Sequence, residues 1–392
     1  MFDFNQRRLL DLADRAKDLG CELFVLDDGW FGMRNNDKAG LGDYNVNLKK
    51  LPDGMAGLAE KIRAKGLQFG LWFEPESVNP DSDLYRAHPD WALQLPRICP
   101  TEQRHQLVLN LAREEVENFV FSTINRLLSE HPGISYIKWD CNRMMTDAPH
   151  PNIYFDYIAA YYRIMQKLRQ AHPQVMFQCC SAGGGRMDLG AAAFHEEFWL
   201  SDNTDAHDRL YMQWSASHFF PAGSIGAHVT ASPNLYTGRA CSLKFRFDVA
   251  LSGRIGFELD PRRLSESEKE ELRERLVLAD ELRPLVQQGD LYRLVSPYEG
   301  SDSALLYTDG EQALLLAYTT GRTFTDRHLN IPLRGLQAHR HYLLEELLPD
   351  SPHPLCPLRD HTLSGTELMN NGLTICWNRP LQSVCLRLRP ST

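Results

Sequence analysis

Seven short apolar segments rich in β-forming residues recur between residues 23 and 259, and amphipathic helical stretches separate most of them. This repetition of strand and helix predicts parallel strand pairing, because parallel neighbours need a long crossover connection that is usually a helix. The predicted strands span residues 23–28, 69–74, 134–140, 175–181, 197–202, 224–229 and 254–259. The predicted helices span residues 5–19, 56–65, 113–130, 154–171, 206–219 and 266–282.

The length and rhythm of this series favour a (β/α)8 (TIM) barrel, a fold that typically takes about 250 residues. Five of the predicted strands end in Asp, Glu or Cys followed by Gly, Pro, Asn or Ser, and a barrel carries its chemistry at the C-terminal ends of its strands. A doubly wound open sheet shares the alternation, but no GxGxxG turn follows the first predicted strand. The run at 107–111 follows another apolar run at 91–95 without an intervening helix, which predicts an inserted hairpin. The series therefore supplies seven strands where a closed barrel has eight, and we expect the first strand to be the missing one.

The pattern changes after about residue 288, where short β-rich runs alternate with turn signals such as TDGE. Runs of this kind predict an antiparallel all-β domain. We therefore expect a (β/α) barrel domain that carries the chemistry over residues 1–288 and a small antiparallel β-sandwich domain over residues 289–392. The second domain is expected to bury barrel surface without taking part in the chemistry, because barrel sites lie at the rim.

Composition narrows the function classes. The chain has 392 residues, a net charge of −9, 43% hydrophobic and 24% charged residues, which describes a globular protein with a large core and makes nucleic acid an unfavourable partner. No run of about 18 apolar residues exists and the N-terminus lacks the apolar region of a signal peptide, so we expect no membrane partner and a cytoplasmic location. The nine cysteines show neither a CxxC pair nor zinc-site spacing. They predict reduced thiols, with no metal and no cofactor.

The segment YIKWD at 136–140 places Lys138 and Asp140 on the same face of a strand. On spacing alone, a solvated surface pair is the commoner explanation for such neighbours. If the strand lines a barrel, Lys138 points inward one layer below Asp140 and its charge favours the ionised carboxylate. An ionised carboxylate in a fixed position can act as a nucleophile.

A second acid, Asp202, ends the segment at 197–202 after an apolar run that predicts a partly dry setting for it. Asp205 and Asp208 compete for the same role, and an N-cap function of Asp202 or Asn203 is an equal alternative. Glycoside hydrolases typically use two carboxyl groups whose pKa values differ because their environments differ.

Other strand ends carry residues suited to sugars. Asp27 and Asp28 lie next to Trp30, and adjacent carboxylates with an aromatic ring suit hydroxyl-rich ligands. The alternative for this pair is a metal site or a turn, and metal binding is disfavoured because His228 is the one histidine near a predicted strand end. Further candidates are Trp72, Glu74, Glu76, Arg104 and the glycine-rich loop at 179–186.

These residues together resemble the bacterial α-galactosidases (melibiase, raffinose-type) of glycoside hydrolase family 36. The motifs that carry the resemblance follow one another from residue 2 to about residue 300, and they are LFVLDDGWFGMRNND, LGDYNVN, FGLWFEPESVNPDSDLYRAHPDW, YIKWDCNR, GGGRMDLG, WLSDNTDAHDRL, GAHV, GFELD and GDLYRL. The resemblance implies a retaining exo-glycoside hydrolase that removes terminal non-reducing α-D-galactose from oligosaccharides such as melibiose and raffinose. It implies that Asp140 is the nucleophile and Asp202 the acid/base.

The resemblance also assigns residues that bind the substrate. Asp27 and Asp28 would contact the galactose O4 and O6 hydroxyls, and Cys180 with the glycines after it would face the sugar 2-position. The remaining residues implied in the pocket are Trp72, Arg104, Lys138, Asn142 and Gly183.

Two departures from the family pattern change these expectations. Family members usually carry ESCSGGGGR where this chain has Gln178 and Ala182, and the methyl group of Ala182 would occupy space near the sugar 2-position. Typical members are about twice as long, with an N-terminal β-sandwich and a first barrel strand ahead of this chain's first residues. We therefore expect a shortened chain whose strand at 23–28 presents an unpaired edge, and which needs a homo-oligomeric partner or a missing N-terminal domain.

Three alternatives remain open at this stage. An α-N-acetylgalactosaminidase is permitted by the altered loop, and a truncated, catalytically weak or inactive carbohydrate-binding fragment by the missing strand. A Schiff-base aldolase that uses Lys138 is the third, although Asp140 two residues away opposes the low lysine pKa that such chemistry needs.

Overall fold

The computed structural model describes residues 2–321, 325, 327–350 and 353–391. The chain divides into two compact units, Met1–Trp199 and Leu200–Thr392.

A parallel sheet forms the centre of the first unit, with its strands in the order β1-β2-β5-β6-β7. Every neighbouring pair in this series is parallel, as the alternation of strands and helices predicts. The strands are β1 (Leu23–Leu26), β2 (Gln68–Phe73), β5 (Ile134–Trp139), β6 (Met176–Cys179) and β7 (Glu197–Trp199). Within this unit, β1 lies at the end of the series and pairs along one edge with β2.

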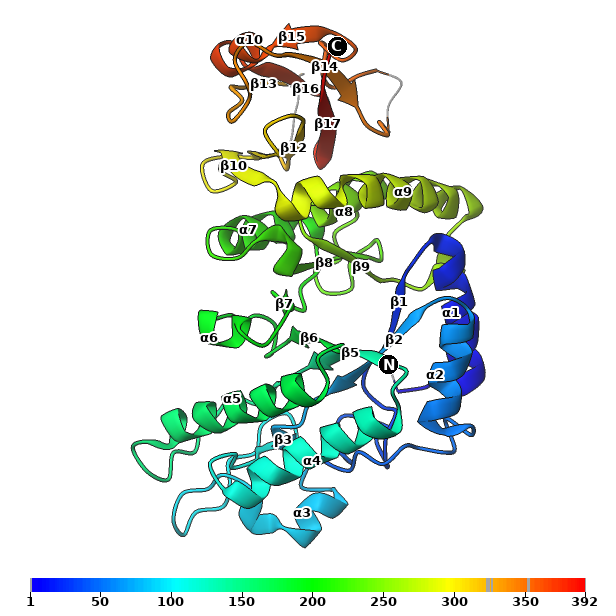
Figure 1. Cartoon of the computed structure of the whole chain (residues 1–392), viewed down its shortest axis with the longest axis vertical. Coiled ribbons are helices and arrows are strands. Elements are labelled where there is room, and N and C mark those ends of the chain that lie inside the picture. The colour runs from blue at the N-terminus through cyan, green and yellow to red at the C-terminus, as the bar shows by residue number, and fades with distance from the viewer. Residues whose placement is uncertain (1, 322–324, 326, 351–352, 392) are drawn as a thin grey trace. The chain divides into compact units, whose positions relative to one another are not determined.

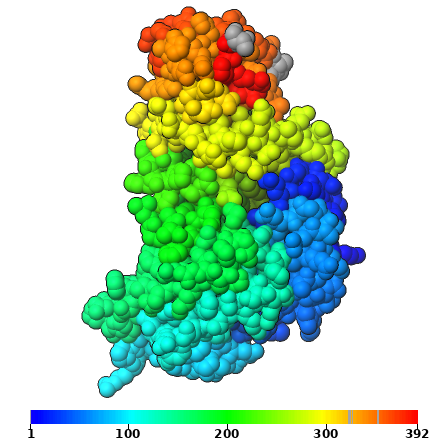
Figure 2. Space-filling view, in the orientation of Figure 1, coloured from blue at the N-terminus to red at the C-terminus, as the bar shows by residue number. Residues whose placement is uncertain are grey.

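Amphipathic helices connect these strands, and α4 and α5 lie side by side (Figure 1). Atoms of α2, α4 and α5 are visible on the surface of this unit in the space-filling view (Figure 2). The helices are α1 (Gln6–Leu19), α2 (Gly54–Ala64), α3 (Asp83–Ala87), α4 (Glu114–Glu130), α5 (Ile153–Ala171) and α6 (Leu189–Ala192). Local sequence explains the ends of α1, because the Asn5 side chain accepts a hydrogen bond from the Arg8 amide and Gly20 adopts a left-handed conformation at φ 100°.

The core of the first unit contains fully buried aromatic side chains from loops and strands, including Trp30 and Trp139. The predicted hairpin between 91–95 and 107–111 forms. The Leu93 amide donates to the Val108 carbonyl oxygen at 2.8 Å and the Asn110 amide to the Trp91 carbonyl oxygen at 2.7 Å, on either side of an antiparallel bridge between Ala92 and Leu109. Strand β4 (Leu107–Val108) also pairs with β3 (Ser77–Val78), a contact with the chain after β2 that a search for neighbouring apolar runs does not find.

The second unit begins with a parallel pair, β8 (Ile225–Thr230) and β9 (Arg254–Glu258), together with its helices. The α-helices of this unit are α7 (Ala206–Ala216), α8 (Leu243–Ala250), α9 (Glu266–Gln288) and, between β15 and β16 of the antiparallel region, α10 (Gly365–Asn370). Helix α9 opens with a capping box in which Ser265 and Glu268 satisfy each other's backbone amides.

Antiparallel strands follow α9 in the order β10-β11-β12-β17-β14-β15, and a two-stranded ladder joins β13 to β16. The strands are β10 (Asp290–Val295), β11 (Asp302–Thr308), β12 (Ala313–Thr319), β13 (Arg327–Ile331), β14 (His341–Glu346), β15 (Thr362–Ser364), β16 (Leu373–Trp377) and β17 (Gln382–Pro390).

The two units therefore confirm the predicted fold class: strands and helices of a (β/α)8-type barrel, followed by an antiparallel all-β region. The parallel strands in the described residues number seven, and each coincides with a predicted segment. No helix within the described ranges is long and apolar enough to cross a membrane.

Candidate active site

Asp140 follows β5 directly, and its carboxylate is held by three donors. Trp72 Nε1 and Asn142 Nδ2 donate to its Oδ2 at 3.0 and 2.6 Å, and the Cys141 amide donates to its Oδ1 at 2.9 Å. Its own amide donates to the Phe73 carbonyl oxygen at 2.7 Å, which extends the pairing of β5 with β2 to the catalytic candidate. The side chain is 6% exposed. A buried carboxylate with this number of partners has a single orientation.

Lys138 lies on the same face of β5 as Asp140. Its Nζ is 2.9 Å from Asp27 Oδ2 and 5.9 Å from the centre of the Trp199 ring. Burial alone would lower the pKa of Lys138, but the charges of Asp27 and Asp140 outweigh this and raise it well above its ordinary value. Lys138 is therefore a cation at neutral pH, which disfavours its use as a Schiff-base nucleophile.

The adjacent acids after β1 have different environments. Asp28 is buried and accepts hydrogen bonds from two nitrogen atoms of Arg34. Nε donates to Oδ1 at 2.9 Å and to Oδ2 at 3.1 Å, and Nη2 donates to Oδ2 at 2.8 Å. Burial raises the pKa of Asp28 in spite of this pairing. Asp27 is 43% exposed and carries the contact with Lys138. Asp27 is thus the accessible member of the pair, while Asp28 is already engaged inside the protein.

Glu74, which directly follows β2, interacts electrostatically with Asp140, and the sequence alone did not predict this interaction. Its Oε1 accepts from the Asn142 amide at 2.8 Å and its Oε2 accepts from Gln106 Nε2 at 3.1 Å. Burial, and then the charge of Asp140, raise the pKa of Glu74 to about 8. Glu74 therefore tends to be neutral at physiological pH and supports the turn that follows Asp140.

Glu76 has the opposite electrostatic setting. It accepts from Trp139 Nε1 at 2.7 Å and Tyr157 Oη at 2.9 Å, and it forms an ion pair with Arg186. Burial would raise the pKa of Glu76, but Arg186 and these hydrogen bonds lower it below its ordinary value. The buried carboxylate links β5 and α5 to the glycine-rich loop that ends at Arg186.

The glycine-rich loop begins at Cys180, whose amide donates to the Trp139 carbonyl oxygen at 2.8 Å. Burial raises the pKa of the Cys180 thiol well above its ordinary value, so the thiol is not ionised. Ala182 and Gly183 both have left-handed backbones, at φ 48° and 86°. A Cβ on Gly185 would lie 2.5 Å from the carbonyl oxygen of Ser181, so the turn closes only with glycine there.

Arg104 stands apart from this group. It is exposed, with φ 52°, in a turn closed by a bridge between Gln103 and Gln106. Direct contacts in the first unit join Trp72, Asn142 and Asp140, and join Lys138 to Asp27. The described contacts do not bring Arg104 to these residues.

The second unit carries Asp202, in the loop before α7. The N-cap of α7 is Asp205, which accepts from the His207 and Asp208 amides at 2.9 and 3.3 Å and pairs with Arg239. The predicted N-cap function of Asp202 or Asn203 is therefore wrong, because Asp205 immediately precedes α7 and caps it. Asp205 is buried, and its carboxylate already binds two backbone amides and Arg239.

Asp202 itself is exposed, so the expectation of a partly dry setting is wrong. The apolar strand before it ends at Trp199, three residues before Asp202. Asp208 accepts from Asn203 Nδ2 at 2.7 Å and His207 Nδ1 at 2.9 Å, which ties the loop to the first turn of α7.

Asp205, His207 and Asp208 have ligand atoms close enough to hold a metal ion. The guanidinium of Arg239 already pairs with both carboxylates of this group. The positive charge of Arg239 therefore already balances negative charge of Asp205 and Asp208.

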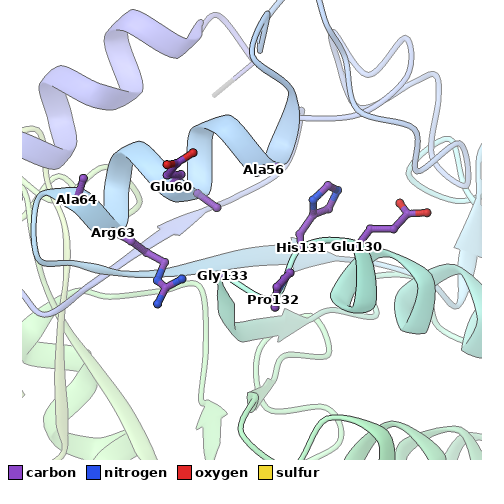
Figure 3. Close-up of a pocket in the computed structure, with 9 residues that line it drawn as sticks. Ala56, Glu60, Arg63, Ala64, Glu130, His131, Pro132 and Gly133 are labelled. Atoms are coloured by element: carbon purple, nitrogen blue, oxygen red, sulfur yellow. The ribbon is translucent and has the colours of Figure 1, made fainter.

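A cavity of about 390 Å³ lies elsewhere in the first unit, between α2 and the turn after α4 (Figure 3). Figure 3 shows α2 on one side and the end of α4 with its turn on the other. Its lining is largely apolar, and it consists of Ala56, Ala59, Glu60, Arg63, Ala64, Glu130, His131, Pro132 and Gly133. It contains none of the predicted site residues.

Comparisons with known proteins give a consistent assignment. The Melibiase family matches residues 1–289, and the glycosyl hydrolase family 36 C-terminal domain matches residues 302–388. Alpha-galactosidase AgaA of Geobacillus stearothermophilus is 43% identical over 356 residues, which cover 88% of this chain and 49% of the relative. Alpha-galactosidase 2 of Hypocrea jecorina is 38% identical over 404 residues, which cover 100% of this chain and 52% of the relative.

Solved structures agree. A crystal structure of a variant of AgaA from Geobacillus stearothermophilus in complex with raffinose has a TM-score of 0.93 and 39% identity, and the match covers 100% of this chain and 54% of that one. This chain spans about half the length of the curated relatives it matches. The chain belongs to the melibiase family, the α-galactosidases of glycoside hydrolase family 36.

Proposed function

We propose that this chain carries the catalytic machinery of a retaining exo-acting α-galactosidase that removes terminal α-D-galactose from oligosaccharides such as melibiose and raffinose. The observation that carries the proposal is the buried carboxylate of Asp140, oriented by Trp72 and Asn142 on the same strand face as the Lys138 cation. Relatives named alpha-galactosidase, one of them crystallised as a variant with raffinose, support the substrate class.

The reaction would proceed by double displacement. Asp140 attacks the anomeric carbon while Asp202 donates a proton to the leaving glycosidic oxygen, so that a covalent galactosyl-enzyme forms and the aglycone departs. Asp202, now a base, removes a proton from water, the water oxygen displaces Asp140, and galactose leaves with retained configuration. The exposure of Asp202 supports this role, because the residue must exchange protons twice in each cycle.

Substrate binding is assigned from accessibility and loop shape. Asp27 and Lys138 offer an acceptor and a donor to sugar hydroxyls, whereas Asp28 would act mainly through its pairing with Arg34. Cys180, Ala182 and Gly183 are proposed to face the sugar 2-position, and Arg104 to reach the substrate from its exposed turn.

We further propose that residues 1–288 act as the catalytic barrel domain, with 289–392 as a covering domain, in a cytoplasmic protein that works as a homo-oligomer or with a further N-terminal domain.

The decisive experiment measures turnover of 4-nitrophenyl α-galactoside by the purified chain and by its Asp140→Asn variant. We expect hydrolysis by the unsubstituted chain, no hydrolysis by the variant, and α-galactose as the first product by NMR. Hydrolysis of the 2-acetamido analogue at an equal rate would favour the α-N-acetylgalactosaminidase alternative. Binding of galactose without turnover would establish a carbohydrate-binding fragment. Trapping of a substrate on Lys138 by borohydride would favour the aldolase alternative.

A further inference from the structure

Arg209, on α7, is a buried guanidinium that binds backbone carbonyl groups. It donates from Nη2 to the Ser201 oxygen at 2.5 Å, from Nε to the Asn203 oxygen at 2.9 Å and from Nη1 to the Gly226 oxygen at 3.1 Å. The side chain is 2% exposed. The first two carbonyl groups flank Asp202 on either side in the sequence, and the third belongs to β8.

A buried cation of this kind needs compensation. Burial lowers the pKa of Arg209 to about 10, and the negative charges of Glu258 and Asp202 oppose that shift. Arg209 therefore remains charged at neutral pH, and its guanidinium makes charge-assisted hydrogen bonds, which are stronger than those between neutral groups. Its planar fork can hold several acceptors in fixed positions at once.

The geometry explains how an exposed side chain can still be placed accurately. The Ser201 carbonyl lies in the peptide plane that precedes the Asp202 Cα, and the Asn203 carbonyl lies in the peptide plane one residue beyond it. Holding both carbonyl groups limits how the short segment between them can move, and the contact with Gly226 anchors this segment to β8. The other charged contacts of this loop act farther along, because Arg239 pairs with Asp205 and Asp208 at the start of α7. Arg209 thus binds both carbonyl groups that flank Asp202 in the sequence.

We propose that Arg209 is the positioning residue for the acid/base Asp202, and that proton delivery to the leaving group depends on its hold on the 201–203 backbone. The inference rests on the proposed function of Asp202. It predicts a specific kinetic signature, because loss of position at the acid harms only substrates whose leaving group needs a proton. A purely structural role of Arg209 would lower turnover of every substrate by the same factor.

The test compares melibiose with 2,4-dinitrophenyl α-galactoside, whose leaving group departs without protonation. For Arg209→Met we expect kcat/KM on melibiose to fall about 100-fold and kcat/KM on the dinitrophenyl substrate to fall less than about 5-fold. Arg209→Lys should show a smaller split in the same direction, since it keeps the charge but not the fork.

Arg246→Met is the matched control. Arg246 is also buried, lies in the same unit and donates to the carbonyl oxygens of Thr230 and Ser242, so its loss should affect both substrates equally. Asp202→Ala calibrates the assay, because it must itself show the split if Asp202 is the acid/base. Absence of the split in Asp202→Ala refutes the proposed function of Asp202, whereas its presence there and absence in Arg209→Met overturns the proposal for Arg209.

A second measurement does not depend on turnover. Hydrogen exchange followed by mass spectrometry should show faster exchange of the amides at 202–205 in Arg209→Met than in Arg246→Met. Unchanged protection of these amides in a folded Arg209→Met protein would overturn the proposal even if the chain is inactive.

Discussion

The surroundings of Asp140 and of Asp202 differ in how the protein holds a carboxylate. Asp140 is buried, and side-chain donors from Trp72 and Asn142 bind its oxygen atom directly. Asp202 is exposed, and Arg209 instead holds the backbone on either side of it. Direct hydrogen bonds fix the orientation that a nucleophile needs, whereas support through the backbone fixes the loop that carries an exposed acid/base. The difference therefore matches the two roles that double displacement requires.

The largest expected effect is on the directly bound carboxylate. Asp140→Asn should lower kcat on 4-nitrophenyl α-galactoside by about 10⁴-fold or more, because it removes covalent catalysis. Azide added to Asp140→Gly should yield β-galactosyl azide, since azide then enters from the vacated face. Near-normal turnover by Asp140→Asn, with an unchanged melting temperature, would remove Asp140 from the mechanism.

Asp202→Ala should cost about 10²- to 10⁴-fold on melibiose and much less on activated aryl galactosides. Azide should here give α-galactosyl azide, the opposite configuration, because Asp140 remains as the nucleophile. A crystal structure of the active protein should place the two carboxyl groups about 5–5.5 Å apart, as in retaining enzymes. A separation near 9 Å, or Asp205 in place of Asp202, would defeat the pairing.

A smaller effect concerns the neutral carboxyl group beside Asp140. The pKa of Glu74 is raised to about 8 in the folded chain, above its value in the unfolded chain, so the folded state binds the extra proton between about pH 4.5 and 8. Its contribution to the free energy of unfolding is present at low pH and is lost as the pH rises toward 8. The loss should be on the order of 2–4 kcal/mol by urea denaturation.

Glu74→Gln should flatten that pH dependence, because the amide does not titrate. The Oε1 atom of Gln106 has no hydrogen-bond partner among the described residues, so rotation of its amide would offer an acceptor to the new side chain. An equally steep decline in the variant would assign the pH dependence to other groups.

The smallest expected effect is at Ala182, whose φ of 48° is a strained conformation for a residue with a Cβ. Ala182→Gly should raise the free energy of unfolding by about 0.5–1 kcal/mol and should leave turnover of α-galactosides within about 2-fold. Gly183→Ala, at φ 86°, is the matched reverse substitution and should destabilise the chain. Equal stabilities of the two variants would show that the loop is not under this constraint.

Periodicity predicts the seven parallel strands because each alternation is a local signal, and residues that follow strand ends identify Asp140 and Asp27 for the same reason. The contacts that give these residues their properties join distant parts of the chain. Asp140 meets Trp72, which is 68 residues away, and Lys138 meets Asp27, which is 111 residues away. Local patterns do not encode such pairs, so the coupling of Glu74 was not foreseen.

The errors at Asp202 have a local origin. An apolar run predicted a buried setting for Asp202, but the strand ends at Trp199 and Asp202 lies exposed in the loop between that strand and α7. The sequence SDNTDAHD offers several cap candidates, and the contacts of Asp205 with Thr237 and Arg239 select one of them. The buried Arg209 had no signal of its own, since an arginine within a helix is ordinarily a surface residue.

The turn at Gly185 limits which substitutions the chain can accept at this position. A single methyl group there would collide with the carbonyl oxygen of Ser181. The closed turn therefore fixes the distance from Cys180 to Arg186. Arg186 forms an ion pair with Glu76, and Glu76 accepts a hydrogen bond from Trp139, the residue before Asp140. A substitution at Gly185 would open this turn, and we expect it to shift Asp140, the nucleophile of the proposed mechanism, through Arg186, Glu76 and Trp139. We therefore expect such variants to lower turnover although the substituted residue is not one of the carboxylates proposed to act in the reaction.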